Sequence, residues 1–116
     1  MSYTLDGQPI EAEIEPQQKG GTLWVPLRPL GKALGGNVDW DPDNEVAVLY
    51  LGSPIATVKI GDANVDVDGQ QTALQEAPYM DDGETWVPVR FFNNPLGYAL
   101  NVDLGANSVD FTRPSA

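Results

Sequence analysis

Three acidic residues at alternate positions, Asp39, Asp41 and Asp43, have the spacing of the oxygen ligands in a calcium-binding loop. Such loops also need a glycine for the sharp turn and a bidentate glutamate at the far end. Asn44 and Tyr50 stand at those two places here. The same alternation is expected of a strand that runs into a turn, where Asp and Asn are favoured. The sequence therefore leaves two interpretations open, a weak calcium site or a solvent-exposed turn.

The chain contains few of the residue types on which other catalytic chemistry depends. It contains no histidine and no cysteine, so the commonest general base, the commonest transition-metal ligand and the thiol nucleophile are all missing. Glu11, Glu13 and Glu15 offer carboxylates for glycoside chemistry, but alternating acids of this kind usually form the solvated face of a strand. We predict a protein that is not an enzyme and needs no cofactor, unless calcium occupies the acidic loop.

The charge of the chain narrows the range of partners. Seventeen acidic residues against six basic ones give a net charge of −11 over 116 residues. A nucleic-acid partner is not expected, because phosphate binding needs a basic surface. No apolar run approaches the ~20 residues of a membrane span, so membrane insertion is not expected either. The chain is long enough for a single domain over residues 1–116.

A stretch of eight residues occurs twice, at positions 21–28 and 83–90, a separation of 83 − 21 = 62. Both copies carry tryptophan, proline and arginine at matching places, namely Trp24, Pro26 and Arg28 in the first and Trp86, Pro88 and Arg90 in the second. Further matches predict two pseudo-repeats, about residues 5–51 and 67–112. Towards the end of each repeat the match shifts by two residues, so that Asn37 corresponds to Asn101.

The repeated residues suggest structural roles first and binding roles second. A tryptophan on a short strand usually buries its large apolar surface in the core, although an exposed pair could hold a sugar or a partner. Arg28 and Arg90 stand at the start of helical segments, where a cation opposes the helix dipole. We expect their guanidinium groups to bind strand-end carbonyls or a carboxylate, and consider an anion site as the alternative.

The elements that hold these residues are short, as expected of a chain with 12 glycines and 10 prolines. Ile10, Ala12 and Ile14 alternate with glutamates and predict one half-exposed strand over residues 8–15. A leucine every three or four residues predicts a short helix that begins near Leu27. The second helix, over about residues 90–97, is interrupted by a proline and is expected to be one irregular turn.

These motifs together resemble a known family. Residues 24–28, Leu34-Gly35-Gly36, Val38-Asp39-Trp40-Asp41 and residues 86–91 follow one another as in the copper amine oxidase N-terminal domain-like family, the stalk domain of bacterial surface proteins. The resemblance implies an α+β fold, in which a twisted antiparallel sheet packs on one or two short helices. It also implies a non-catalytic accessory role, and the missing histidine ligands give no reason to expect copper here.

Two functional hypotheses follow. The first is a structural or interaction module of the bacterial cell surface that assembles with copies of itself into an extracellular filament or layer. Assembly would use β-strand addition, with the strand that carries Ile10, Ala12 and Ile14 as the donor. The second is a module that binds cell-wall polysaccharide through exposed aromatic rings. The candidates for those rings are Trp40, Tyr79, Trp86 and Tyr98.

Overall fold

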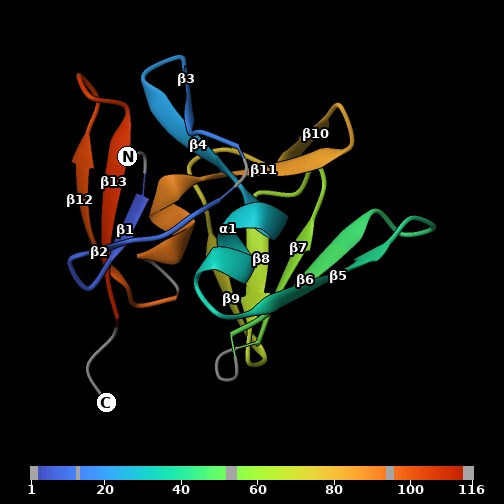
Figure 1. Ribbon diagram of the computed structural model, residues 1–116. Coiled ribbons are helices and arrows are strands. Elements are labelled where there is room, and N and C mark those ends of the chain that lie inside the picture. The colour runs from blue at the N-terminus through green and yellow to red at the C-terminus, as the bar shows by residue number, and fades with distance from the viewer. Residues whose placement is uncertain (1–2, 13, 52–54, 94–95, 114–116) are drawn as a thin grey trace.

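The computed structural model describes residues 3–12, 14–51, 55–93 and 96–113, which form three small sheets around one helix (Figure 1). The predicted α+β class, with antiparallel strands and a short helix, is confirmed. All strand pairs are antiparallel except β1 with β13, which is parallel. Within the described residues, no helix has the length and apolar character that crossing a membrane would require.

The repeated motif builds the central sheet, whose strand order is β10-β11-β4-β3. Its strands are β3 (Gln17–Lys19), β4 (Thr22–Pro26), β10 (Tyr79–Asp81) and β11 (Glu84–Pro88). Val25 lies opposite Val87, and each tryptophan lies opposite the proline of the other copy. Opposite residues share a face and neighbours alternate. The two valines therefore face the core, where both are fully buried, and the tryptophans and prolines lie together on the other face.

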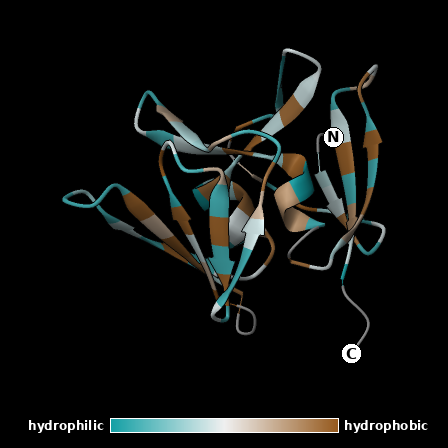
Figure 2. Cartoon of the chain, turned by 180° about the vertical axis from the view of Figure 1, so that it is seen from behind, coloured by the Kyte–Doolittle hydropathy of each residue, from teal (hydrophilic) through white to brown (hydrophobic). Residues whose placement is uncertain are grey.

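Two further sheets flank the central one. One has the order β12-β13-β1-β2 and the other the order β5-β6-β7-β8-β9. Their strands are β1 (Tyr3–Leu5), β2 (Gln8–Pro9), β5 (Asn37–Asp41), β6 (Val46–Tyr50), β7 (Ile55–Lys59), β8 (Asn64–Val67), β9 (Gln70–Ala73), β12 (Ala99–Asp103) and β13 (Ser108–Thr112). Hydrophobic and hydrophilic residues alternate along several of these strands (Figure 2), as expected when one face meets the core.

Both helical segments follow directly after the prolines. Helix α1 (Leu27–Ala33) buries its leucines. Leu34 is its C-cap residue, and Gly35 follows with a φ of +92°, which suits glycine. Gly31 lets the helix approach the sheet, because a Cβ there would lie 2.7 Å from Leu49 Cδ1. The second segment is the predicted single irregular turn, the 3-10 helix η1 (Val89–Phe92).

The strand predicted over residues 8–15 is wrong in its extent. Strand β2 ends at Pro9, and residues 10–12 carry no strand pairing. The Ile10 amide donates to the Tyr3 carbonyl, and Ile10 and Ala12 pack against the core. Ile14 is half-buried, and its carbonyl accepts the Tyr3 hydroxyl. The alternation therefore reflects which side chains face the core along an irregular segment, and not the pairing of a strand.

Corresponding elements keep a constant spacing along the chain. Strands β4 and β11 begin 84 − 22 = 62 residues apart, and β5 and β12 begin 99 − 37 = 62 residues apart. The predicted shift by two residues is therefore wrong, since Asn37 takes the place of Ala99 and not that of Asn101. Duplication as the origin of this spacing stays a prediction.

Tyr3 makes the stability of the fold depend on pH in the alkaline range. Its ring is buried, and its hydroxyl donates to the Ile14 carbonyl at 3.0 Å. Burial, with the nearby charge of Glu15, raises the pKa of Tyr3 above its ordinary value of about 10. The stabilisation that neutral Tyr3 gives to the folded state is therefore complete below pH ~10. It is lost as the pH rises above that value, because Tyr3 loses its proton first in the unfolded state.

We expect Tyr3→Phe to lower the free energy of unfolding by about 1 kcal/mol at neutral pH, through the lost hydrogen bond. The variant should also lose stability less steeply than the parent above pH 10. Urea unfolding between pH 7 and 11 measures both effects. If the free energy of unfolding of the variant fell with pH above pH ~10 as steeply as that of the parent, Tyr3 would not be the cause of the alkaline loss of stability.

Candidate functional site

In the acidic loop, residues 39–44, the Asp41 side chain forms hydrogen bonds within the turn that follows it. Asp41 Oδ1 accepts the amides of Asp43 and Asn44 at 3.1 and 3.4 Å, and Asp41 Oδ2 accepts the Asn44 side-chain amide at 2.8 Å. Asp39 and Asp43 are exposed. No three acidic side chains converge as metal ligands anywhere in the described residues. These hydrogen bonds are those of the turn interpretation, and calcium binding at this loop stays a prediction.

The hydrogen bond from the Asn44 side chain, with those from the two turn amides, lowers the pKa of Asp41. We expect Asn44→Ala to raise that pKa towards the ordinary value for aspartate, because the largest cause of the shift is removed. Carboxyl chemical shifts followed by NMR from pH 2 to 6 measure the change. The Asp41 contribution to stability is present above the unfolded-state pKa and is lost as the pH falls through the lower folded-state value. An unchanged Asp41 pKa in the variant would contradict this assignment.

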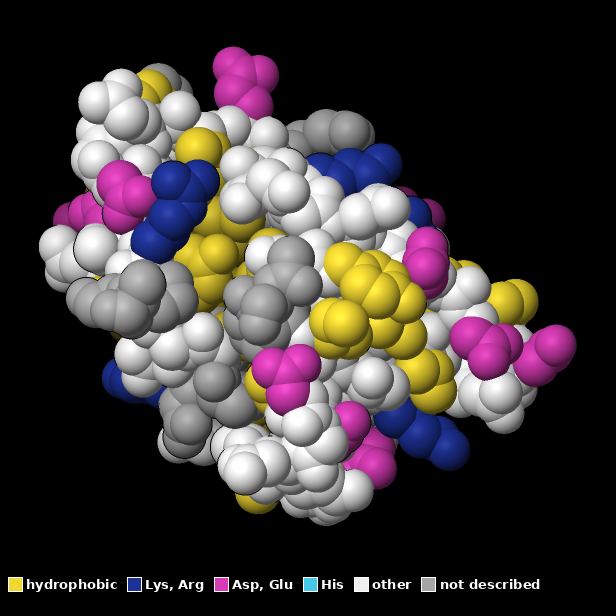
Figure 3. Space-filling model, turned by 90° about the horizontal axis from the view of Figure 1, so that it is seen from below, with side chains coloured by type: hydrophobic (Ala, Val, Ile, Leu, Met, Phe, Trp, Pro, Cys, Tyr) yellow, Lys and Arg dark blue, Asp and Glu magenta, His cyan; other side chains and the backbone are white. Residues whose placement is uncertain are grey.

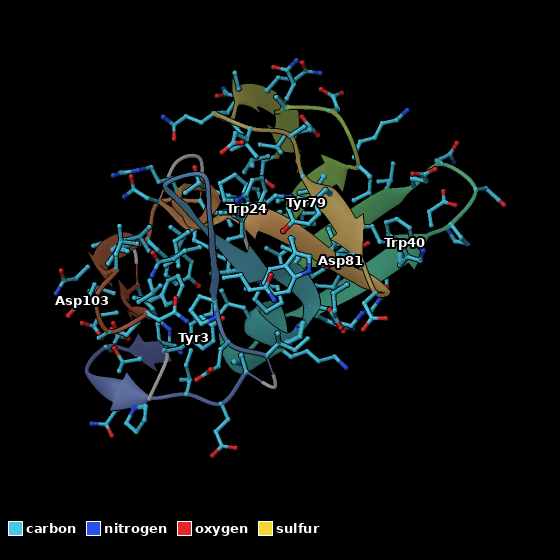
Figure 4. The ribbon with its side chains drawn as sticks, turned by 90° about the horizontal axis from the view of Figure 1, so that it is seen from above. Tyr3, Trp24, Trp40, Tyr79, Asp81 and Asp103 are labelled. Atoms are coloured by element: carbon cyan, nitrogen blue, oxygen red, sulfur yellow. The ribbon has the colours of Figure 1, made fainter. Side chains whose placement is uncertain are left out.

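The two repeated tryptophans are buried, as their structural role requires, and each has 3% of its surface exposed. Trp24 packs edge-on against the ring of Tyr79, with 4.8 Å between ring centroids, and Lys19 Nζ lies 4.5 Å from the centre of that ring. Figure 4 shows Trp24 and Tyr79 together near the middle of the molecule. The indole N–H of Trp24 is buried and has no acceptor among the described residues. Neither tryptophan offers a free face to a ligand.

The same burial limits the aromatic rings that could hold a sugar. Trp86 and Tyr98 are buried, and burial also raises the pKa of the Tyr98 phenol. Trp40 and Tyr79 are half-buried and keep some ring surface accessible. The four predicted rings therefore do not form one exposed platform.

The two repeated arginines differ in their partners. Arg28 Nη1 donates to the Val38 carbonyl at 3.0 Å, joining helix α1 to strand β5. No hydrogen bond or ion pair links the Arg90 side chain to any part of the chain that the structure describes. The exposed Arg90 side chain instead lines a cavity.

This cavity, of about 360 Å³, lies between the β3–β4 hairpin and strand β12. Its lining combines polar and apolar surface in similar amounts, with Leu23, Pro88, Leu100, Val102 and Leu104 beside Arg90, Gln75 and Thr22. Two hydrogen bonds brace the hairpin against the β12–β13 turn, from Gln18 Nε2 to the Leu104 carbonyl at 2.6 Å and from Asn107 Nδ2 to the Pro16 carbonyl at 2.7 Å. The cavity cannot be recognised in the sequence, because only folding brings its four segments together.

Strand β12 beside the cavity is a sheet edge. It pairs with β13 on one side, and no described strand pairs with its other side. Val102 and Leu104 are 37% and 46% exposed, among the most exposed large apolar residues described. On the lower face of the molecule, hydrophobic side chains also reach the surface, with acidic ones among them (Figure 3). The β12 edge combines exposed apolar side chains with a strand side that no described strand pairs, as the β10 edge also does at Met80.

Comparison with known proteins gives a match over nearly the whole chain. The family model described as "Copper amine oxidase N-terminal domain" matches residues 4–111. A protein of Brevibacillus choshinensis named "Protease inhibitor" is 28% identical over 102 residues, which cover 88% of this chain. The chain spans 31% of the length of that relative.

Proposed function

The chain belongs to the copper amine oxidase N-terminal domain family, and on that premise we propose that it is a non-catalytic interaction module of the bacterial cell surface. It associates with copies of itself by adding strands at the edge of β12. The family supports the accessory role, since the N-terminal domain of copper amine oxidases is not the catalytic one. The Brevibacillus relative is named "Protease inhibitor", a name that also refers to an effect on another protein.

The accessible edge of β12 carries this proposal. Proteins usually protect sheet edges with very short strands, prolines or charges. Strand β2, at the other edge of the same sheet, is protected in this way, because it has two residues and ends in Pro9. Strand β12 has five residues, and the exposed Val102 lies within it. We therefore assign strand addition to β12 and not to the predicted strand over residues 8–15.

The edge that pairs with β12 determines the form of the assembly. Strand β5 (Asn37–Asp41) is the edge of the five-stranded sheet and corresponds to β12 in the 62-residue spacing. Figure 4 places Trp40 on β5 and Asp103 at the end of β12 on opposite sides of the central sheet. Pairing of β12 in one copy with β5 in the next is heterologous, and it produces an open filament or layer instead of a closed dimer.

Salt and a single lysine test the proposal. Each copy carries a net charge of −11, so the copies repel and association strengthens as salt screens that charge. Val102→Lys places a charge on the β12 edge and should abolish association. Ile55→Lys is the matched control, because it adds the same charge at an exposed position of β7, which is paired on both sides. Light scattering and negative-stain microscopy in low and high salt give the readout.

Two results would count against self-association. One is a monomer at every salt and protein concentration. The other is a Val102→Lys protein that assembles as well as the Ile55→Lys control. Either would shift attention to a different protein partner, with a protease as the first to test because of the name of the relative.

Binding of cell-wall polysaccharide is the second candidate, supported by the accessible ring surface of Trp40. The chain has three tryptophans, and the other two are buried. A glycan stacked on Trp40 would shift the fluorescence of this residue first, and Trp40→Phe would remove the shift. Titration with soluble cell-wall polysaccharide decides between the candidates, because association through β12 produces no glycan-dependent signal.

A further inference from the structure

Two cavities of this molecule occupy corresponding places. The large cavity lies between the β3–β4 hairpin, η1 and β12, and a smaller one of about 70 Å³ lies between the β10–β11 hairpin, α1 and β5. Five lining residues of each correspond at the 62-residue spacing: Gly21, Thr22, Leu23, Leu100 and Val102 in the large cavity, and Gly83, Glu84, Thr85, Val38 and Trp40 in the small one. Arg90 and Arg28 form a sixth corresponding pair.

The small cavity shows how such a site is filled. Trp40 lines it, and its side chain packs against the hydrophobic core. Arg28 donates to the Val38 carbonyl, which belongs to the same strand as Trp40. The chain thus satisfies this site by itself, with an indole at the wall of the cavity and a guanidinium on a nearby peptide oxygen.

The large cavity lacks both features. Val102 stands where Trp40 stands in the other site, so an indole is replaced by an isopropyl group. Arg90 makes no hydrogen bond to the described residues, and its donors remain available. The volume of about 360 Å³ falls within the range of small-ligand sites, roughly 300–1,000 Å³.

We propose that the large cavity binds an aromatic side chain of an extended peptide segment that pairs along β12. Arg90 donates to a peptide carbonyl or carboxylate oxygen next to that aromatic residue, as Arg28 does within the chain. Strand pairing supplies affinity in this mode of recognition, and a side-chain pocket beside the edge supplies specificity. This inference rests on the proposed function for the pairing along β12. The pocket itself can be tested without it.

A second hollow gives room for the neighbouring residues of such a peptide. It measures about 230 Å³ and shares Gln75, Pro88 and Arg90 with the large cavity. Leu74 and Phe91 line it further along. Arg90 therefore lines both hollows, where its guanidinium can bind the backbone oxygen between two side chains of the peptide.

Two small probes test the pocket on the whole chain. N-acetyl-tryptophan offers an indole with a carboxylate, and N-acetyl-tryptophanamide offers the same indole with a carbonyl. We expect NMR titrations to shift the amide signals of Thr22, Arg90 and Val102 together. Arg90→Gln should weaken the carboxylate probe about tenfold and the amide probe less, because a charge-assisted hydrogen bond is stronger than a neutral one.

A substitution that reproduces the small cavity gives the sharpest control. Val102→Trp places an indole where Trp40 stands in the other site, and should abolish binding of both probes. Trp40→Val does the reverse, and should add a second set of shifts at Thr85 and Arg28. Since Arg90→Gln changes an exposed side chain, it keeps the test valid if Val102→Trp fails to fold. Unaltered probe binding in a folded Val102→Trp protein, or no shifts at all, would overturn the proposal.

The pocket and the assembly can fail separately. Probe binding with a protein that stays monomeric supports the pocket and contradicts self-association. Assembly in the absence of probe binding contradicts the pocket and leaves strand addition supported by the backbone alone. If both hold, N-acetyl-tryptophan should inhibit assembly, because an incoming aromatic residue needs the same space.

Discussion

Replacing Phe92 with alanine is expected to lower the free energy of unfolding by about 3–5 kcal/mol, the usual range for a buried phenylalanine. Phe92 lies on η1 with no exposed surface. Its ring meets Phe91, Phe111 and Tyr98 edge-on, at centroid distances of 5.3, 5.6 and 6.4 Å. The contact with Phe111 joins the irregular second helix to β13, and the substitution removes it together with the other two ring contacts.

Chemical denaturation followed by tyrosine and tryptophan fluorescence measures the loss. Leu104→Ala is the matched control, because Leu104 is partly exposed and its truncation should change stability by no more than about 0.5 kcal/mol. A domain of this size is usually stable by about 5–15 kcal/mol, so the Phe92 variant is expected to unfold well below the parent midpoint. A loss below about 1 kcal/mol would contradict the central role given to this ring.

Gly36→Ala is expected to destabilise the fold by about 3 kcal/mol, although it adds only one methyl group. A Cβ at this position would collide with the Tyr50 carbonyl oxygen and would lie 2.7 Å from Leu51 Cδ2. The Tyr50 carbonyl belongs to β6, which is paired on both sides within the five-stranded sheet. Relief of the collision therefore requires a shift of the sheet or of the α1–β5 connection.

Gly105→Ala is the control for this variant. A Cβ at Gly105 would have its nearest neighbour at 3.4 Å, the Asp103 Oδ1 atom, and should be tolerated within about 0.5 kcal/mol. Thermal unfolding of the two alanine variants side by side gives the comparison. Equal melting temperatures would show that the close approach of residue 36 to β6 does not limit stability.

The sequence predicts those parts of the fold that local chemistry determines. The spacing of Leu27, Leu30 and Leu34 predicts a short helix, and the structure has α1 over Leu27–Ala33. A proline after Asn94 predicts an irregular second turn, and η1 has four residues. In both cases residues a few positions apart decide the outcome, so no knowledge of distant contacts is needed.

The predictions that fail depend on long-range pairing. Ile10, Ala12 and Ile14 alternate as a strand would, but whether they pair depends on which segment lies beside them. Gln17–Lys19 is polar, and yet it forms β3 because its partner β4 is held in the central sheet. A period of two shows which side chains are buried and leaves the hydrogen-bond partner undetermined.

The candidate site lies beyond what the sequence could show, for a related reason. The cavity depends on the difference between Val102 and Trp40, and the two-residue shift in the sequence match pairs Trp40 with Leu104 instead. Only the constant spacing of the strands makes the correct comparison visible. The motif residues themselves were visible, although their shared face became clear only from the register of β4 and β11.

The parallel pairing of β1 with β13 has a mechanical consequence. Tyr3 lies beside Val109 and Leu5 beside Phe111, so the chain enters this pair of strands at one end and leaves it at the other. A pulling force applied at Tyr3 and Thr112 would therefore load the hydrogen bonds between the strands in shear, all at the same time. An antiparallel pair pulled from one end would open bond by bond. Under tension, this domain would resist extension at strands β1 and β13, and its lifetime in the folded state would follow from the rate at which that pair of strands ruptures.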